Sequence, residues 1–274
     1  KKYSRYLQTF VCNELVRISN WITSNKLSLN IEKTNFIVFS KSKIPDDIPS
    51  VFINGSHIKR VNYIKFLGVI IDEKLSWSYH INHIKGKISK SIGMLSCARR
   101  NLDRQTLLKL YFAFIHPYLN YCIDVWGRCN QHYFQTLFRL QKRSVRLITF
   151  STWRAHSAPL FETLEILSLE HMYIMSVSLF MYKFYFRLLP PVVDELFQFN
   201  SAIHTINTRQ RTLLHVPIVH SRISKQSIRV RGVQIFNQLP QIVNINQLTF
   251  YQFRCTMRRG LINNSVSVRL SPLQ

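Results

Sequence analysis

The chain has 274 residues, of which 37 are Lys or Arg and 13 are Asp or Glu, so its formal net charge is +24 at pH 7. This charge points to a polyanionic partner, and a hydrophobic fraction of 46% with 13% aromatic residues excludes a disordered basic tail. The 7 glycines stand too far apart for a phosphate-cradling loop, and 5 cysteines without a Cys-x-x-Cys pair indicate free thiols in a reducing, intracellular compartment.

The first 76 residues are expected to combine one helix with a small antiparallel sheet. Apolar residues recur at three- and four-residue spacing over 3–25, which predicts an amphipathic helix. Thr34–Ser40 and Tyr63–Asp72 are rich in β-branched and aromatic residues, as strands are. Between them, Asn54-Gly55 separates two short apolar runs and predicts a β-hairpin.

The rest of the chain is expected to be mainly helical, followed by a basic region of mixed structure. Periodic apolar patterns predict helices at 79–100, Thr106–Ile115, Tyr118–Trp126, Tyr133–Thr149, Leu169–Leu188, Gly232–Leu239 and Leu248–Leu261. The apolar run 172–189 contains Lys183 and Arg187 and is too short for a bilayer, so no membrane segment is predicted. The result is an α+β fold with regions at 1–76, 77–150 and 151–274.

Basic residues concentrate in two of these regions. Helix 79–100 has an apolar stripe on one side and carries five cations away from it: Lys85, Lys87, Lys90, Arg99 and Arg100. Residues 196–274 hold ten basic residues, nine of them arginines, and no acidic one. A solvated surface is the ordinary fate of such charges, but the scarcity of acids favours contact with nucleic-acid phosphates.

Carboxylates suggest a catalytic metal site at two places, and neither is convincing. Asp46-Asp47 is an adjacent pair of the kind that two-metal chemistry uses, but Pro45 and Pro49 bracket it and favour a solvated turn. Asp72 follows a predicted strand, where it more often organises a turn. No catalytic metal site is predicted.

Histidines and cysteines give two weaker candidates. One set has zinc-ligand types at spacings that match no compact zinc module: His116, Cys122, Cys129 and His132. The alternative places Cys122 inside an apolar helix and both histidines at polar edges. The second candidate is His80 and His83, which share a helix face where nearby lysines favour phosphate contact or simple solvation over a metal.

Several segments together resemble the reverse transcriptases of non-LTR retrotransposons, LINE-type elements similar to jockey. The resemblance runs through Asn25–Phe39 (NKLSLNIEKTNFIVF), Phe66–Ile81 (FLGVIIDEKLSWSYHI), Lys87–Leu95, Leu110–Trp126, Leu140–Ile148 and 232–240 (GVQIFNQLP). The first two segments are specific in combination, and the later ones would be weak alone.

The resemblance implies roles for particular residues. The stretch with Leu29, Asn30 and Thr34 is similar to palm motif D, and it would make Lys33 the lysine near the incoming triphosphate; the alternative is an exposed residue before a strand. Phe66, Leu67 and Gly68 are similar to motif E, the primer grip, where a glycine lets the backbone approach the primer; the alternative is a glycine at a β-bulge. Residues 1–76 would then be a palm remnant and 77–150 the thumb.

The family's catalytic aspartate pair would lie upstream of Lys1, so the chain alone is expected to bind no cofactor and to lack polymerase activity. Its parent would use two Mg²⁺ ions to extend a DNA primer on an RNA template. RNA template and DNA primer are therefore the expected partners, and the nuclear site of integration is the expected location. The alternative function is that of a degenerate or domesticated nucleic-acid-binding module without catalysis.

Overall fold

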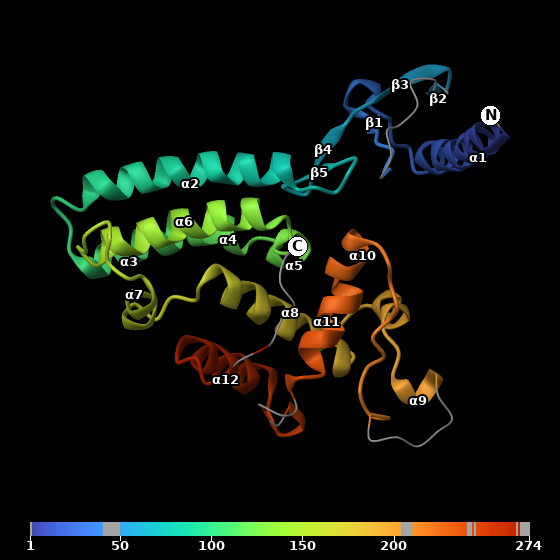
Figure 1. Cartoon of the computed structure of the whole chain (residues 1–274). Coiled ribbons are helices and arrows are strands. Elements are labelled where there is room, and N and C mark those ends of the chain that lie inside the picture. The colour runs from blue at the N-terminus through green and yellow to red at the C-terminus, as the bar shows by residue number, and fades with distance from the viewer. Residues whose placement is uncertain are drawn as a thin grey trace. The chain divides into compact units, whose positions relative to one another are not determined.

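The computed structural model describes residues 2–40, 50–203, 210–239, 243, 245–266 and 268, and gives no side-chain account of residues 2–9. It contains two compact units, Lys1–His80 and Ile81–Gln274, which we call the N-terminal unit and the C-terminal unit. Figure 1 labels their helices and strands. The predicted α+β fold class is confirmed, while the three functional regions at 1–76, 77–150 and 151–274 stay a prediction.

The N-terminal unit opens with helix α1 (Lys2–Ser24), which confirms the helix predicted over 3–25. The helix ends where Lys26 takes a left-handed conformation with φ of 55° and the Asn25 side chain donates to the carbonyl oxygen of Trp21. A short 3-10 helix at Ile31–Lys33 follows.

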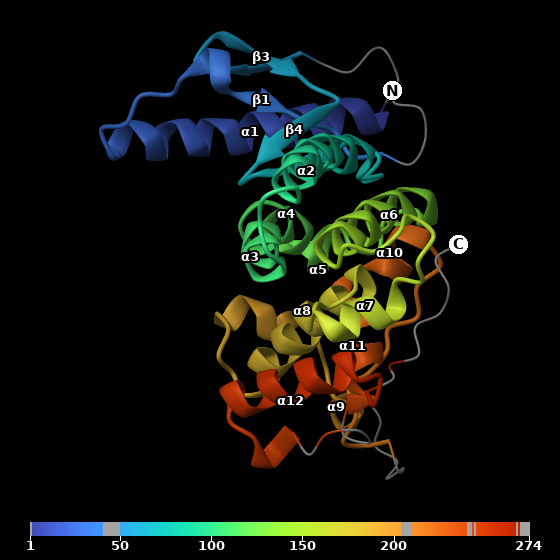
Figure 2. The same cartoon turned by 90° about the vertical axis from the view of Figure 1, so that its left-hand side faces the viewer.

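The strands of this unit form two small sheets rather than one. They are β1 (Asn35–Phe36), β2 (Val51–Ile53), β3 (Ser56–Arg60), β4 (Tyr63–Phe66) and β5 (Val69–Asp72). In the first sheet the order is β1-β3-β2, and in the second β4 pairs with β5. Figure 2 shows α1 with β1, β3 and β4 of this unit.

The predicted hairpin at Asn54-Gly55 is confirmed. These residues have φ of 50° and 75°, and they join β2 and β3 in an antiparallel pair. Two successive left-handed residues match the twist of the flanking strands. The expectation of a wholly antiparallel sheet is wrong in one detail: because β2 occupies one edge of β3, β1 takes the other edge and runs parallel to β3.

Among its described residues, the N-terminal unit has a small apolar core. Every second residue of β2 is buried, and Val51 and Ile53 form a cluster with Ile58 of β3. Apolar residues of α1 and of the segment after it pack against this cluster: Val11, Leu15, Leu29, Ile31 and Phe36. The helix therefore covers one face of the first sheet.

The C-terminal unit is helical over most of its described residues. Its helices are α2 (Ser78–Ala98, which begins at the end of the N-terminal unit), α3 (Arg104–Phe114), α4 (His116–Asn120), α5 (Ile123–Trp126), α6 (Gln131–Ile148), α7 (Ala158–Thr163), α8 (Leu169–Tyr185), α9 (Asn200–Ile203), α10 (Arg222–Gln226), α11 (Ile228–Phe236) and α12 (Phe250–Ile262). Two 3-10 helices lie at Pro191–Leu196 and Ile245–Gln247. Within the described ranges, no helix is both long and apolar enough to cross a membrane.

The helix expected over Thr106–Ile115 is confirmed as α3, whereas the helix expected over Tyr118–Trp126 is divided between α4 and α5. Asp103 caps α3 by accepting from the backbone N–H groups of Gln105 and Thr106, and Pro117 lies in the first turn of α4. The helix predicted over Tyr118–Trp126 is broken at Cys122, which has a φ of 50° and precedes α5. Apolar periodicity continues across this break because residues on both sides of it face the core.

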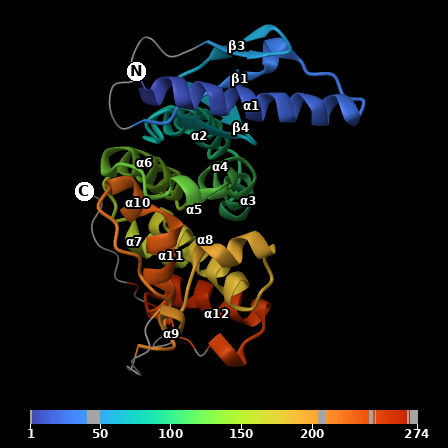
Figure 3. The ribbon, with the colours of Figure 1, turned by 90° about the vertical axis from the view of Figure 1, so that its right-hand side faces the viewer.

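Helix α8 lies at the centre of this unit, beside α11 and α12 (Figure 3). The Tyr182 ring stacks on Phe253 of α12, with ring centroids 4.7 Å apart, and its hydroxyl donates to the carbonyl oxygen of Leu248. In the basic region expected to have mixed structure, the regular elements among the described residues after 196 are helices and one isolated β-bridge between Phe199 and Leu214.

Candidate nucleic-acid interface

The segment predicted to be the primer grip is the tip of a tight β-hairpin. β4 and β5 pair antiparallel, and Phe66 lies opposite Val69. The two residues between them, Leu67 and Gly68, have φ of 43° and 88°. The strand expected to run continuously through Tyr63–Asp72 is therefore wrong, and so is the bulge considered for Gly68, because two successive left-handed residues reverse the chain.

The tip of this hairpin presents apolar side chains to solvent. Phe66 is 60% exposed and Leu67 is 76% exposed. The two residues are consecutive in the chain, so the turn presents two large apolar side chains to solvent. They can contact the apolar faces of sugars and bases.

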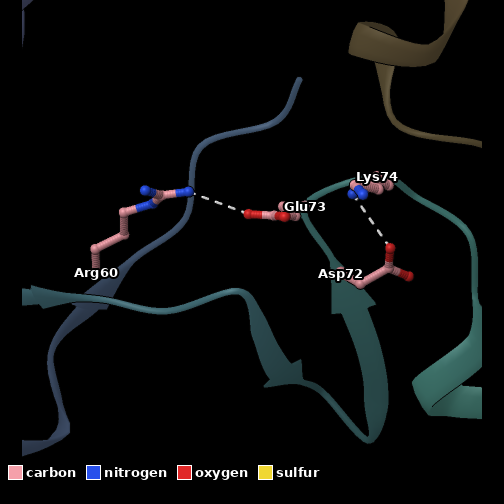
Figure 4. Close-up of polar contacts among 4 residues, drawn as sticks. All are labelled: Arg60, Asp72, Glu73 and Lys74. Atoms are coloured by element: carbon pink, nitrogen blue, oxygen red, sulfur yellow. Dashed lines mark hydrogen bonds and ion pairs between the residues drawn. The ribbon is translucent and has the colours of Figure 1, made fainter. Parts of the chain in front are cut away.

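Asp72, at the end of β5, organises the turn that leads from the hairpin into α2. Its side chain is 3% exposed, and its carboxylate accepts hydrogen bonds from the backbone N–H groups of Lys74, Ser76 and Trp77 at 3.2, 3.0 and 2.8 Å. Figure 4 shows the contact with Lys74. The structural role expected for Asp72 is confirmed, and its oxygens are already committed to the backbone.

An ion pair joins the hairpin to the first sheet. The guanidinium of Arg60, at the end of β3, lies 3.1 Å from the carboxylate of Glu73, which follows β5 (Figure 4). Both side chains are about three-quarters buried, so water screens their attraction less than it would at the surface. The rings of Tyr63 and Tyr79 stack with centroids 4.4 Å apart and hold β4 against the start of α2.

The two histidines at the start of α2 differ in their surroundings. His80 is 1% exposed, and its Nδ1 atom accepts from the backbone N–H of Ile70 at 3.3 Å. His83 is exposed. The shared phosphate-facing role considered for the pair is wrong for His80, because burial at the hairpin removes it from any ligand.

Lys33 is exposed at the end of the 3-10 helix. Asn30 caps this helix: its side-chain oxygen accepts from the backbone N–H of Lys33 at 3.1 Å, and its carbonyl accepts from the Thr34 hydroxyl at 2.7 Å. These bonds fix the backbone of Lys33 and leave its ammonium group in solvent. Its predicted role beside a nucleotide stays a prediction.

The three lysines of α2 lie on its solvent side. The apolar stripe expected on this helix is buried and consists of Ile81, Ile84, Ile88, Ile92 and Leu95. Lys85, Lys87 and Lys90 are exposed, and within the described part of the chain none of them forms an ion pair. Apart from the adjoining residues and the backbone of α2 itself, no atom lies within 4 Å of a Cβ position built at Gly86 or Gly93.

The two arginines that close this segment lie just beyond α2 and differ from the lysines. Arg99 is half-buried, and its guanidinium carbon lies 5.1 Å from the centroid of the Phe150 ring. Arg100 is exposed. Arg99 therefore belongs to a different surface from Lys85, Lys87 and Lys90.

That second surface is a cleft which sequence reasoning did not identify. A cleft of about 320 Å³, which we call the arginine cleft, is lined by Arg99, Arg143, Arg146, Leu147, Ser151 and Trp153. The signal lay in the segment Leu140–Ile148, LQKRSVRLI, where Arg143 and Arg146 are three residues apart on one helix without an acid between them. What the sequence alone could not show is that Arg99 and Trp153 join them.

The described arginines of 196–274 do not all lie on one exposed surface. Arg231 is 6% exposed and lies within α11. Arg258 lies 4.0 Å from the carboxylate of Glu165 and donates to the carbonyl oxygen of that residue at 2.8 Å. An arginine from a region that has no acidic residue of its own is thus paired with a glutamate from another segment. Arg209 lies outside the described residues.

Among the residues that the structure describes, no three His, Cys, Asp or Glu side chains come together as metal ligands would. Asp46 and Asp47 lie outside the described residues.

Cys122 is half-buried in a left-handed turn, so the alternative that placed it inside a helix is wrong. Burial, with Arg258 nearby, lowers the pKa of His116, and burial, with Asp124 nearby, raises the pKa of Cys122.

Comparison with known proteins places polymerases of mobile elements among the relatives of this chain. It is 27% identical over 155 residues to a probable RNA-directed DNA polymerase from transposon X-element of Drosophila melanogaster, a match over 55% of this chain. It is 29% identical over 136 residues, 48% of the chain, to the RNA-directed DNA polymerase from mobile element jockey of Drosophila funebris. It is 25% identical over 126 residues, 44% of the chain, to a Pol polyprotein from retrotransposable element R1 of Bradysia coprophila.

The X-element and jockey relatives define the class of RNA-directed DNA polymerases from transposable elements. In particular, the jockey, X-element and R1 relatives confirm the resemblance to non-LTR retrotransposon enzymes. The matched segments cover 17%, 15% and 12% of the three relatives, so they span about a sixth or less of the length of each relative. No protein-family model and no solved structure matches the chain.

Proposed function

We propose that this chain is the template-primer-binding part of an RNA-directed DNA polymerase of a non-LTR retrotransposon. The observation that carries the proposal is the solvent side of α2, where Lys85, Lys87 and Lys90 are exposed without an ion-pair partner among the described residues. The names of the polymerase relatives imply nucleic-acid substrates. A net charge of +24 also favours binding to nucleic acid.

The lysines of α2 bind the phosphate backbone of an RNA–DNA duplex. Each lysine that neutralises a phosphate releases condensed counterions, so binding depends on charge and salt rather than on base sequence. Gly86 and Gly93 lie seven residues apart on the same side of the helix as Lys90. Because neither carries a side chain, a backbone can approach α2 closely there.

The hairpin tip of the N-terminal unit holds the primer strand in this proposal. Phe66 and Leu67 contact sugar surfaces, and Gly68 allows the turn that exposes them. Lys33 lies near the incoming triphosphate. In this proposal the catalytic aspartates and the two Mg²⁺ ions belong to another segment of the parent polymerase. The parent polymerase acts in the nucleus.

The experiment is a titration of a fluorescent RNA–DNA template-primer with the 274-residue chain at several salt concentrations. A triple variant, Lys85→Ala, Lys87→Ala and Lys90→Ala, is expected to bind more weakly. The slope of log affinity against log salt should fall by about one for each phosphate that a lysine no longer neutralises, and so by up to about three.

A charge-matched control removes three exposed lysines from other helices and turns: Lys26, Lys109 and Lys225. Both triple variants lose the same net charge, so only a local contact distinguishes them. A larger loss of slope in the α2 variant supports the proposal. Equal slopes in the two variants, or no salt dependence in the unmodified chain, would refute it.

A further inference from the structure

The arginine cleft brings together three guanidinium groups and one indole ring from separate parts of the C-terminal unit. Arg99 follows α2, Arg143 and Arg146 lie on α6, and Trp153 lies in the segment between α6 and α7. The lining contains no Asp or Glu. Its volume of about 320 Å³ is at the small end of the range of ligand pockets.

Two of the arginines are held in place by the protein itself. The Nε atom of Arg146 donates to the carbonyl oxygen of Ala155 at 2.8 Å, which ties α6 to the segment that carries Trp153. The guanidinium of Arg99 lies over the Phe150 ring at 5.1 Å. These contacts use one nitrogen of Arg146 and one face of Arg99, so other N–H groups of both can donate to a ligand.

The cationic side chains of the arginine cleft favour binding of an anion. Among the described residues no carboxylate forms an ion pair with Arg99, Arg143 or Arg146, and the three guanidinium groups repel one another. A phosphate relieves that repulsion, and the planar fork of arginine matches phosphate oxygens better than a lysine ammonium does. A phosphate is therefore the anion that this cleft suits best.

Trp153 provides an aromatic surface beside the arginines, and a phosphate alone would not contact it. It is 77% exposed, and the guanidinium carbon of Arg154 lies 4.6 Å from the ring centroid. A flat ring that is exposed beside a phosphate site is suited to stacking on a base. Bases inside a duplex already stack on each other, so only an unpaired base can reach it.

We propose that the arginine cleft binds one nucleotide of a single-stranded RNA or DNA segment. Arg99, Arg143 and Arg146 hold its phosphate, and its base stacks on Trp153. The site goes beyond the proposed duplex contact of α2, because it binds a strand before it enters, or after it leaves, the paired region. Its binding does not depend on Lys85, Lys87 or Lys90.

The test measures the affinity of the 274-residue chain for three probes by fluorescence anisotropy: a single-stranded 12-nucleotide RNA, the same RNA with its bases removed, and the RNA paired with DNA. Trp153→Ala is expected to weaken binding of the intact single strand about tenfold. It should leave the base-free strand and the duplex unchanged. Trp153→Phe retains a stacking ring and should restore most of the affinity.

Arg143→Ala tests the phosphate contact without disturbing the fold, since Arg143 is exposed and lies on α6. It is expected to weaken both single-stranded probes severalfold, and Arg143→Lys should restore only part of the loss. The matched controls are Arg139→Ala, an exposed arginine one turn earlier on α6, and Tyr251→Ala, a 74% exposed aromatic residue on α12. Both should bind like the unmodified chain.

Each outcome bears on the proposal. Unchanged single-strand affinity in Trp153→Ala, an equal loss for duplex and single strand, or losses as large in the two controls would each overturn it. A free nucleoside triphosphate that displaces the strand at equimolar concentration would also overturn it, because the site would then take a nucleotide rather than a strand. Failure here leaves the lysine-dependent duplex binding intact, so the two proposals fail separately.

Discussion

The two units of this protein are stabilised in different ways. In the N-terminal unit the buried cluster of the first sheet has three strand residues, Val51, Ile53 and Ile58, and α1 leaves Phe10 and Trp21 56% and 61% exposed. Polar contacts complete it: the Asp72 carboxylate, the Arg60–Glu73 ion pair and a hydrogen bond from Ser19 to Asn54. Because the described residues of this unit bury little apolar area, a few polar groups contribute a large share of its stability.

The C-terminal unit is stabilised mainly by apolar packing. Its fully buried side chains include Tyr111 and Leu107 of α3, Trp126 of α5 and Phe253 of α12. A large apolar core tolerates the repulsion of surface cations because each charge costs little beside the energy of burial. The C-terminal unit, which has the larger apolar core, therefore carries the dense cationic surfaces. The smaller N-terminal unit carries the hairpin tip.

The largest effect is expected at a buried polar group that joins three elements of the C-terminal core. Gln141 on α6 is fully buried, and its side chain donates to Tyr111 and to the carbonyl oxygen of Leu167 and accepts from the N–H of Leu169. Gln141→Ala leaves those buried groups without partners and opens a cavity. The free energy of unfolding of the C-terminal unit should fall by about 4 kcal/mol.

Thiol labelling during urea unfolding can report each unit separately. Cys12 lies in the N-terminal unit, and Cys129 is buried in the C-terminal unit, where burial raises the pKa of its thiol to about 12 and suppresses its reaction. Gln141→Ala should expose Cys129 at lower urea and leave Cys12 unchanged. Gln131→Ala, at the exposed start of α6, is the control. If both thiols shift together, the units do not differ as described.

A smaller loss is expected from Asp72→Ala in the N-terminal unit. The change removes the acceptor of three backbone N–H groups and should cost about 2–3 kcal/mol, measured as earlier reaction of Cys12 in urea. Asp72→Asn keeps one acceptor oxygen and should lose less. The exposed Asp194→Ala removes the same charge from the C-terminal unit and should have no effect on Cys12.

The functional consequence of Asp72→Ala can be measured on the same protein. The turn that Asp72 stabilises lies between the hairpin and α2, so losing it should loosen the tip at Phe66 and Leu67 and weaken template-primer binding. Unaltered stability in Asp72→Ala would mean that the N-terminal unit does not rest on this carboxylate.

Local chemistry made part of the fold predictable from the sequence. Asn54-Gly55 carries its own turn preference, and the three- and four-residue spacing of the apolar residues in 3–25 and 79–100 defines a helical face without tertiary information. The predicted burial of the α2 stripe and the exposure of Lys85, Lys87 and Lys90 follow from that spacing.

What could not be predicted depends on contacts between distant residues or on single backbone angles. Leu67-Gly68 is a weaker turn signal than Asn-Gly, because Leu seldom takes a left-handed conformation, so the sequence does not predict this hairpin. The left-handed Cys122 ends a helix whose apolar pattern continues. The arginine cleft joins Arg99 to Trp153, two residues whose meeting depends on how α2 and α6 pack.

The smallest expected effect has the opposite sign and lies on α2. Gly86 and Gly93 are inside the helix and have open space around the Cβ position, so alanine fits at both. Each change to alanine should stabilise the C-terminal unit by roughly 1 kcal/mol, because glycine loses more backbone entropy on forming a helix. Urea unfolding followed by the Cys129 thiol measures the gain.

The affinity for the template-primer duplex tests whether Gly86 and Gly93 allow a nucleic-acid backbone to approach α2 closely. If a phosphate backbone approaches α2 beside Lys90, two added methyl groups should weaken duplex binding even though the helix is more stable. Ser96→Ala, on the same helix at an exposed position, is the control and should leave affinity unchanged. A doubly substituted protein that is more stable and binds the duplex as tightly as before would contradict close approach at this face, because stability and binding oppose each other only where the partner needs the space.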